Sequence, residues 1–220
     1  MSVAAQWLNE TFASFDYSLL EFFHNLNVGP AGGFFDFFFK FITLLGEEGL
    51  FLIILSLIFM LFKKTRKIGF AMLLSIIVGS LITNVTVKPL VARPRPFQNE
   101  ESEFYNLFYQ WWKDAGSVHV GEKSFPSGHT TSAMAAMAGY FFVSKKKSIS
   151  WTAFIFAVLM GMSRIFLCVH YPSDVIGGLV AGLIAGLVAA SLINLLYKKT
   201  ENKVVSKIVE FDIRNVIKKK

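Results

Sequence analysis

The sequence predicts an all-α integral membrane protein: a bundle of six transmembrane helices, preceded by an interfacial N-terminal helix. Hydrophobic residues make up 54% of the 220 residues, more than soluble domains of this size usually carry. They gather in long runs that contain few charges, which is the pattern of membrane spans. The single cysteine, Cys168, excludes an internal disulfide and a cysteine-based metal site.

The N-terminal stretch differs from the apolar runs that follow it. Residues 5–26 alternate aromatic and aliphatic side chains with Glu10, Asp16 and Glu21, a pattern typical of a helix that lies in the membrane interface. The chain therefore divides into three predicted parts: an interfacial segment (1–33), a transmembrane domain (34–197) and a basic cytoplasmic tail (198–220).

Six apolar stretches are the predicted spans: 34–45, 49–62, 68–88, 127–143, 150–168 and 175–197. The first two are short against the roughly 20 residues that a span needs. The first also carries Asp36 and Lys40 four residues apart, on one helical face where they can pair. Glycine and alanine recur along the last stretch at the spacing that lets helices pack closely.

The basic residues predict the orientation in the membrane. Fifteen of them fall on one side of the six-span arrangement: Lys63, Lys64, Arg66, Lys67, Lys145, Lys146, Lys147, Lys198, Lys199, Lys203, Lys207, Arg214, Lys218, Lys219 and Lys220. That side is predicted to be the cytoplasm. The net charge of +7 therefore needs no nucleic-acid partner to explain it. The tail is expected either to rest on anionic lipid or to be a solvated helix.

The opposite side holds a long loop, residues 89–126. Its middle, residues 104–112, is too aromatic for a free linker, and tyrosine and tryptophan favour the headgroup level of a bilayer. We expect an interfacial helix there, serving as a structural anchor or as a lid over a substrate.

A first polar cluster, residues 125–131, closes this loop and opens the fourth span. Ser127 is placed to cap the helix, whose first turn exposes unpaired N–H groups that attract anions. Gly128 lets a ligand approach the backbone, and His129 can hold or release a proton near neutral pH. Taken alone, the motif is also an ordinary start of a helix.

The second cluster combines Lys88, at the end of the third span, with Arg95 seven residues later. Pro94 and Pro96 prevent a continuing helix and stiffen the backbone on either side of the arginine. Arginine binds phosphate oxygens in pairs, whereas lysine acts as a point charge. The pair therefore suits an anionic ligand.

The third cluster joins the fifth span to the sixth. Arg164 lies inside an apolar run, which is costly unless it faces a partner or a wet cavity. Pro172 separates His170 from Asp174, and a carboxylate on one ring nitrogen makes the other a better base or nucleophile. By itself, this cluster also fits an interfacial histidine beside a capping aspartate.

The predicted topology brings all three clusters to the non-cytoplasmic ends of their spans. Two histidines, one aspartate and three or four cations would then line one pocket, which suits a phosphate dianion and the charge of its transfer. Because the pattern contains no cluster of carboxylates, we expect no metal and no other cofactor.

The three clusters together resemble the signature of the type 2 phosphatidic acid phosphatase family. The matching residues are Lys88-x6-Arg95-Pro96, Pro126-Ser127-Gly128-His129 and Ser163-Arg164-x5-His170-x3-Asp174. The resemblance covers roughly residues 34–197. It leaves the N-terminal segment, the aromatic loop and the basic tail unexplained, and it assigns no role to Arg93.

The resemblance implies a role for each matched residue. His170 would attack phosphorus to form a phosphohistidine, Asp174 would orient its ring, and His129 would protonate the leaving oxygen. The phosphoryl oxygens would be held by Lys88, Arg95, Ser127, Gly128 and Arg164. The family is similar in active-site design to vanadium haloperoxidases.

The leading interpretation is a metal-independent phosphatase in the cell membrane, acting on a lipid phosphate or diphosphate on the non-cytoplasmic face. The compact chain favours undecaprenyl diphosphate as substrate, ahead of phosphatidylglycerol phosphate and phosphatidate. A transporter or channel for anions would spread its charges through the membrane depth, and a vanadate-dependent haloperoxidase would lack long apolar spans. A binding protein that has lost the chemistry would not need both histidines and the aspartate. The sequence leaves the oligomeric state open.

Overall fold

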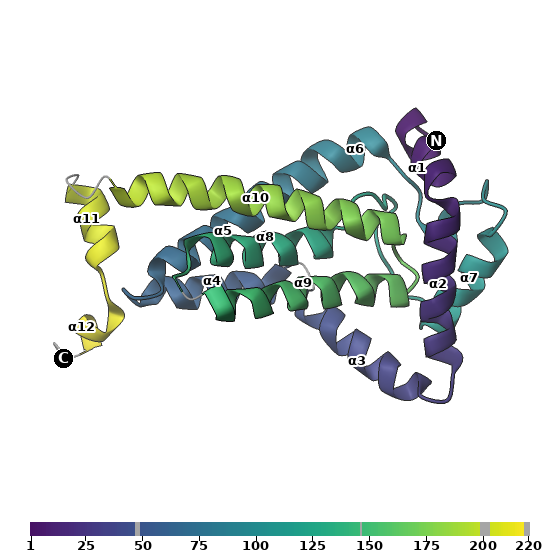
Figure 1. Ribbon diagram of the computed structural model, residues 1–220, viewed down its shortest axis with the longest axis horizontal. Helices are drawn as coiled ribbons and strands as arrows, with labels where there is room; N and C mark the ends of the chain where they lie inside the picture. Colours follow the sequence, from purple (N-terminus) through teal and green to yellow (C-terminus); the bar gives the residue numbers. More distant parts are fainter. Residues whose placement is uncertain (47–48, 146, 199–202, 218–220) are drawn as a thin grey trace.

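The computed structural model describes residues 1–46, 49–145, 147–198 and 203–217, and its elements there are helices, as the sequence predicts (Figure 1). In chain order they are α1 (Val3–Thr11), α2 (Ala13–Val28), α3 (Gly32–Leu45), α4 (Leu50–Leu61), α5 (Arg66–Ser80), the π-helix η2 (Leu81–Val87), α6 (Lys88–Val91), the 3-10 helix η3 (Pro96–Gln98), α7 (Tyr105–Asp114), α8 (Gly128–Val143), α9 (Lys147–Phe166), α10 (Pro172–Lys198), α11 (Lys203–Glu210) and α12 (Ile213–Ile217).

The centre of the bundle is the packing of α5, α8 and α10 against one another, with α4 outside α5 and α9 outside α8. Small residues allow this packing, as the glycine and alanine spacing predicts. At Gly182 of α10, an added Cβ would come within 2.6 Å of Met134 Cβ and 2.7 Å of the Thr131 carbonyl oxygen. The helix backbones of α8 and α10 can therefore approach closely only because Gly182 has no side chain.

The third predicted span is longer than expected, because α5, η2 and α6 form one continuous helix over Arg66–Val91. Its π-helical part lies close to the functional cluster that Lys88 begins, and π turns often mark such places. Thr83 in this part is buried and donates a hydrogen bond to Thr131 Oγ1 of α8 at 3.1 Å. The contact fixes the end of the span that carries Lys88.

The predicted number of six spans is not confirmed. Among the described helices, Arg66–Val91 and Pro172–Lys198 are long and apolar enough to cross a membrane. A third candidate is the pair α2 and α3, which are bent by 117° at their junction. Shorter apolar helices, such as α4 with 12 residues, fall below the usual span length.

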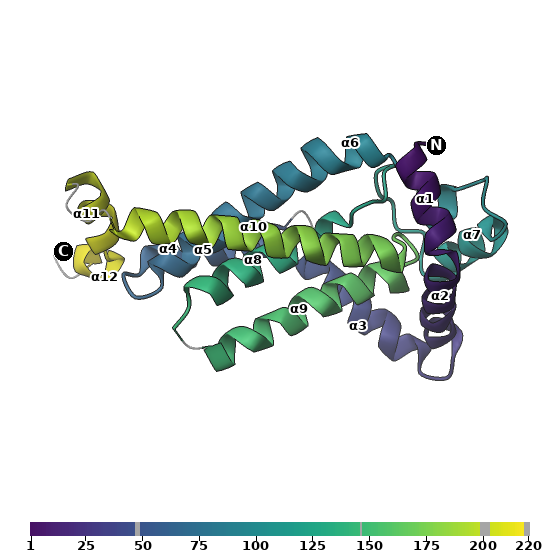
Figure 2. The ribbon, with the colours of Figure 1, turned by 45° about the horizontal axis from the view of Figure 1, so that its top comes forward.

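Helices α1, α2 and α7 lie across one end of the bundle, and α3 slants from α2 toward its centre (Figures 1 and 2). The aromatic stretch predicted at 104–112 forms α7, whose Phe108 and Trp111 are buried against Tyr17 of α2. This packing favours the anchor interpretation of the stretch.

The pair predicted between Asp36 and Lys40 is present, with a shortest N–O distance of 2.7 Å.

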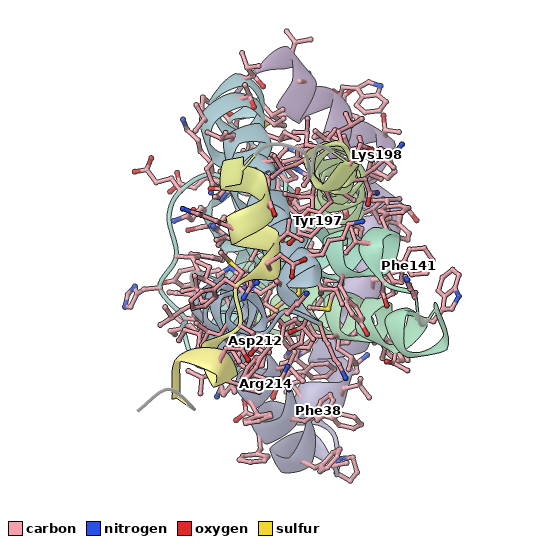
Figure 3. All side chains as sticks on the ribbon, turned by 90° about the vertical axis from the view of Figure 1, so that its left-hand side faces the viewer. Phe38, Phe141, Tyr197, Lys198, Asp212 and Arg214 are labelled. Carbon is pink, nitrogen blue, oxygen red and sulfur yellow. The ribbon has the colours of Figure 1, made fainter. Side chains whose placement is uncertain are left out.

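Helices α11 and α12 lie at the opposite end, where Lys198 and Arg214 are also found (Figure 3). The described part of the tail packs onto the α4–α5 connection: Lys63 pairs with Glu210, and Arg66 donates to the Val209 carbonyl at 3.2 Å. The prediction for the tail also included residues 199–202 and 218–220, which lie outside the described residues, as does Lys146.

The close packing of α8 and α10 predicts that Gly182→Ala destabilises the protein. The added methyl group overpacks the contact with Met134, a change that typically costs about 1–3 kcal/mol. Thermal unfolding in detergent should therefore shift to lower temperature. Gly33→Ala in α3 is the matched control, since an added Cβ there meets nothing within 4 Å. An equal loss in both variants would contradict the packing described here.

Candidate active site

The three polar clusters of the sequence meet around one cavity of about 500 Å³ at the end of the bundle near α7. Six of the eight predicted site residues line it: Lys88, Arg95, Gly128, His129, Arg164 and His170. The other two, Ser127 and Asp174, are fully buried beside it. Lys40, Thr43 and the loop residues 118–121 complete the wall.

His170 lies in the connection between α9 and α10, with its ring buried. Its Nε2 atom is 3.2 Å from Arg95 Nη1. Since a guanidinium can only donate, Nε2 must accept, and the ring proton belongs on Nδ1. The ring therefore carries its unprotonated nitrogen on the side that faces the cations of the cavity.

The Nδ1 side of His170 faces two oxygen atoms. Asp174 Oδ2 lies 3.5 Å away and Ser124 Oγ lies 3.3 Å away, while Ser124 itself donates a hydrogen bond to Asp174 Oδ2. The serine thus lies beside both the ring and the carboxylate. Both groups hold the proton on Nδ1 and fix the plane of the ring.

The pKa of His170 is lowered to about 3, first because burial penalises the imidazolium and second because Arg95 repels it. The hydrogen bond and the negative charge of Asp174 act in the opposite direction but do not compensate. The ring is therefore neutral at physiological pH, as an attacking nitrogen must be.

Asp174 lies in the first turn of α10 and also accepts a hydrogen bond from the backbone N–H of Tyr171 at 2.8 Å. This contact caps the helix from inside its first turn. The carbonyl oxygen of Asp174 accepts from Ser127 N at 3.0 Å, which joins the third cluster to the start of α8. One residue therefore caps α10, orients His170 and fixes the neighbouring helix.

Two arginines and a lysine give the cavity a positive wall. Arg95 is held by the carbonyl oxygens of Val169, at 2.5 Å, and Gly121. Burial lowers its pKa to about 10, so it stays charged at neutral pH. Arg164 donates to Thr43 Oγ1 of α3 at 2.5 Å.

Among the described residues that line the cavity, none is an aspartate or glutamate. Within the same part of the chain, no three His, Cys, Asp or Glu side chains are grouped as metal ligands. The available donors are therefore N–H groups of Lys88, Arg95 and Arg164. Such a donor set fits an oxyanion rather than a cation.

The first turn of α8 presents its residues in different directions. Ser127 occupies the N-cap position without the expected side-chain cap, and its buried Oγ accepts a hydrogen bond from Thr130 Oγ1 at 2.9 Å. Gly128 faces the cavity, and a Cβ there would lie 3.5 Å from Lys88 Nζ. His129 lines both this cavity and a neighbouring one of about 420 Å³ between α4 and α5.

Sequence reasoning missed three residues of the site. Ser124 contacts both His170 and Asp174, Thr43 accepts a hydrogen bond from Arg164, and Arg93 donates to Asp174 Oδ1 at 2.7 Å. Arg93 had a signal, since it lies between the second cluster's Lys88 and Arg95. Ser124 and Thr43 are ordinary polar residues that only the three-dimensional arrangement brings to the site.

Among known proteins, several phosphatases are similar in sequence to this chain. The sequence profile of the PAP2 superfamily matches residues 65–198. Undecaprenyl-diphosphatase BcrC of Bacillus subtilis is 35% identical over 103 residues, which cover 47% of each chain. The chain spans about half the length of the curated relatives that it matches most strongly.

Two solved structures are similar to most of this fold. The crystal structure of a transmembrane PAP2 type phosphatidylglycerolphosphate phosphatase from Bacillus subtilis has a TM-score of 0.63 and 28% identity, covering 87% of this chain and 90% of that one. Aquifex aeolicus LpxE has a TM-score of 0.59 and 27% identity, covering 80% of this chain and 94% of that one.

The buried position of His170 predicts that its ring does not titrate between pH 7 and pH 5. With histidine labelled by ¹³C at Cε1, the His170 signal among the four imidazole signals should keep the chemical shift of the neutral ring. His170→Gln assigns that signal by removing it. Titration of this signal near 6.5, the value of a free histidine, would contradict the described burial.

Proposed function

The chain belongs to the PAP2 superfamily, and we propose that it hydrolyses a phosphate or diphosphate group of a membrane lipid. The observation that carries this proposal is the cavity in which Nε2 of a neutral His170 lies among Lys88, Arg95 and Arg164. A nucleophilic nitrogen among fixed cations suits attack on a phosphorus atom whose oxygens carry negative charge.

In the proposed reaction, the phosphoryl oxygens bind Lys88, Arg95 and Arg164, and Gly128 leaves room for them. His170 Nε2 forms a bond to phosphorus while the bond from phosphorus to the leaving oxygen breaks, and His129 gives that oxygen a proton. Water then attacks the phosphohistidine with His129 as base, which releases phosphate and restores both histidines. The three cations carry the charge stabilisation, so this mechanism needs no metal.

A lipid substrate is supported by the second cavity. It meets the first at Lys88, Gly128 and His129, and extends along apolar side chains of α4 and α5 (Ile53, Ile76 and Ile77). A phosphorylated headgroup would bind in the first cavity with the leaving group toward His129, and an acyl or prenyl chain in the second. Undecaprenyl diphosphate is our leading substrate, ahead of phosphatidylglycerol phosphate and phosphatidate.

We place the site on the non-cytoplasmic face of the cell membrane. The cavity lies at the bundle end that carries α7, whereas Lys198, Arg214 and the basic helix α11 are at the other end. Basic residues favour the cytoplasmic side, and this asymmetry supports the orientation. The substrate would then be reached from the outer leaflet.

The two histidines should respond differently to substitution, because they serve different steps. His170→Ala should abolish turnover on every substrate. His129→Ala should lose more rate on a lipid monophosphate than on the matching diphosphate, since an alkoxide needs a proton more than a phosphate leaving group does. General acid catalysis is typically worth about 10²–10⁴-fold, so the difference is measurable.

The measurement is the single-turnover rate of each variant on the matched pair of lipids, in excess chelator, with the phosphoenzyme trapped by rapid quench. Ser191→Ala is the control, because Ser191 is an exposed residue of α10 that lines neither cavity. Phosphoenzyme that accumulates in His170→Ala but not in His129→Ala would reverse the two roles. Wild-type activity that appears only when a divalent metal is restored would contradict the metal-free mechanism.

The orientation predicts opposite labelling of two exposed positions, Glu101 in the α7 loop and Lys64 in the α4–α5 connection. Each is changed to cysteine in a Cys168→Ser background. In intact cells, an impermeant maleimide should label position 101 and leave position 64 unlabelled until the membrane is permeabilised. Labelling of position 64 alone would overturn the orientation.

A further inference from the structure

We propose that Asp16, in the N-terminal helix α2, is a positioning residue for the reaction, acting through Arg93 on Asp174 and so on His170. The inference rests on the proposed function. It concerns a part of the chain outside residues 65–198, which the PAP2 profile matches. It also gives a task to α2, which the signature motifs leave without one.

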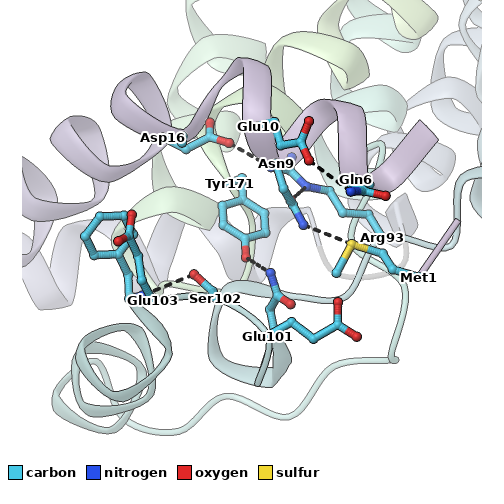
Figure 4. Close-up of a pocket in the computed structure, with 13 residues that line it drawn as sticks. Met1, Gln6, Asn9, Glu10, Asp16, Arg93, Glu101, Ser102, Glu103 and Tyr171 are labelled. Atoms are coloured by element: carbon cyan, nitrogen blue, oxygen red, sulfur yellow. Dashed lines mark hydrogen bonds and ion pairs between the residues drawn. The ribbon is translucent and has the colours of Figure 1, made fainter. Parts of the chain in front are cut away.

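Arg93 is the link between the two carboxylates. Its Nη2 donates to Asp16 Oδ2 at 2.8 Å and its Nη1 to Asp174 Oδ1 at 2.7 Å. Its Nε donates to Asn9 Oδ1 of α1 at 2.7 Å, and its guanidinium lies 3.9 Å from the centre of the Tyr171 ring. Asn9 and Asp16 of the N-terminal helices thus hold the guanidinium from one side (Figure 4), and Asp174 of α10 holds it from the other.

Asp16 also binds the first turn of α10 directly. Its Oδ1 accepts from Ser173 N at 2.8 Å, and its Oδ2 accepts from Ser173 Oγ at 2.6 Å. Ser173 immediately precedes Asp174, and its hydroxyl oxygen accepts in turn from Arg93 Nη1 at 2.7 Å. Asp16 therefore fixes the turn that carries Asp174 through both backbone and side chain.

The three charged side chains of this arrangement are buried. The side chains of Arg93, Asp16 and Asp174 are 1%, 4% and 0% exposed. Charges withdrawn from water in this way are stabilised only by close, well-oriented partners. Two carboxylates share one guanidinium, so Asp174 is only partly neutralised and keeps negative charge for the Nδ1 side of His170.

Loss of the Asp16 charge should change that sharing. Arg93 would then neutralise the Asp174 carboxylate more completely. The carboxylate would therefore stabilise a positively charged or phosphorylated His170 ring less well. Asp16 does not line the cavity in which the phosphate is proposed to bind. The effect should therefore fall on the chemical step and not on substrate binding.

The test is Asp16→Asn, which keeps the size of the side chain, assayed on a lipid phosphate that wild type hydrolyses. We expect kcat to fall by on the order of 10²-fold, the cost of a small misplacement of catalytic groups, with KM unchanged within about 2-fold. Asp16→Glu should recover part of the rate. In an Arg93→Met background, Asp16→Asn should cost less than it does in wild type, because only the direct contacts with Ser173 are then left to weaken.

Leu20→Ala is the matched control, since Leu20 is a buried apolar residue of the same helix that packs into the core. If Asp16 only docked α2, Leu20→Ala at an equal loss of thermal stability would lower kcat as much as Asp16→Asn. That result would overturn the proposal, as would an Asp16→Asn protein with wild-type kcat or one whose KM alone rises.

A second readout separates this proposal from the proposed function. The ¹⁵N resonance of His170 Nδ1 should move in Asp16→Asn and stay in place in Leu20→Ala, whether or not any lipid is hydrolysed. Wild-type protein that releases no phosphate from any lipid would refute the function alone. An unmoved resonance in Asp16→Asn would refute the positioning role alone.

Discussion

The buried carboxylate of Asp174 is the interaction on which the rest of the site depends. Its oxygens accept from Ser124, the Tyr171 N–H and Arg93, and one of them faces His170. A buried charge that loses its partners costs several kcal/mol, so folding requires these groups to be in place. The same contacts that stabilise the start of α10 thereby orient the proposed nucleophile.

The cations that line the cavity depend on the Asp174 carboxylate only indirectly, through the packing of the helices. Glycine at position 182 brings α8 and α10 together, and the hydrogen bond from Ser127 N to the Asp174 carbonyl aligns their ends. Gly128 then faces Lys88 across the cavity. Cations fixed in this way need little rearrangement when negative charge develops, which is the main source of catalytic power in such sites.

The sequence predicted the helical fold and six of the residues that line the cavity, because apolar periodicity and short motifs encode both. Its count of six spans is not confirmed, since α3 and α4 are short helices and the chain bends by 117° between α2 and α3. From the sequence, Asp16 was only one of the charged residues of the predicted interfacial helix. The contact from Asp16 to Ser173 joins residues 157 positions apart, and it exists only because α2 crosses the end of the bundle. The sequence did not identify Ser124 for a similar reason, because only the fold brings this serine to His170 and Asp174.

A structure of the protein with orthovanadate would test the central claim most directly, because vanadate adopts the five-coordinate geometry of phosphorus during transfer. The account predicts a bond from vanadium to His170 Nε2, equatorial oxygens on Lys88, Arg95 and Arg164, and His129 beside the apical oxygen. Vanadium bound through His129, or bound outside this cavity while His170 remains free, would contradict it.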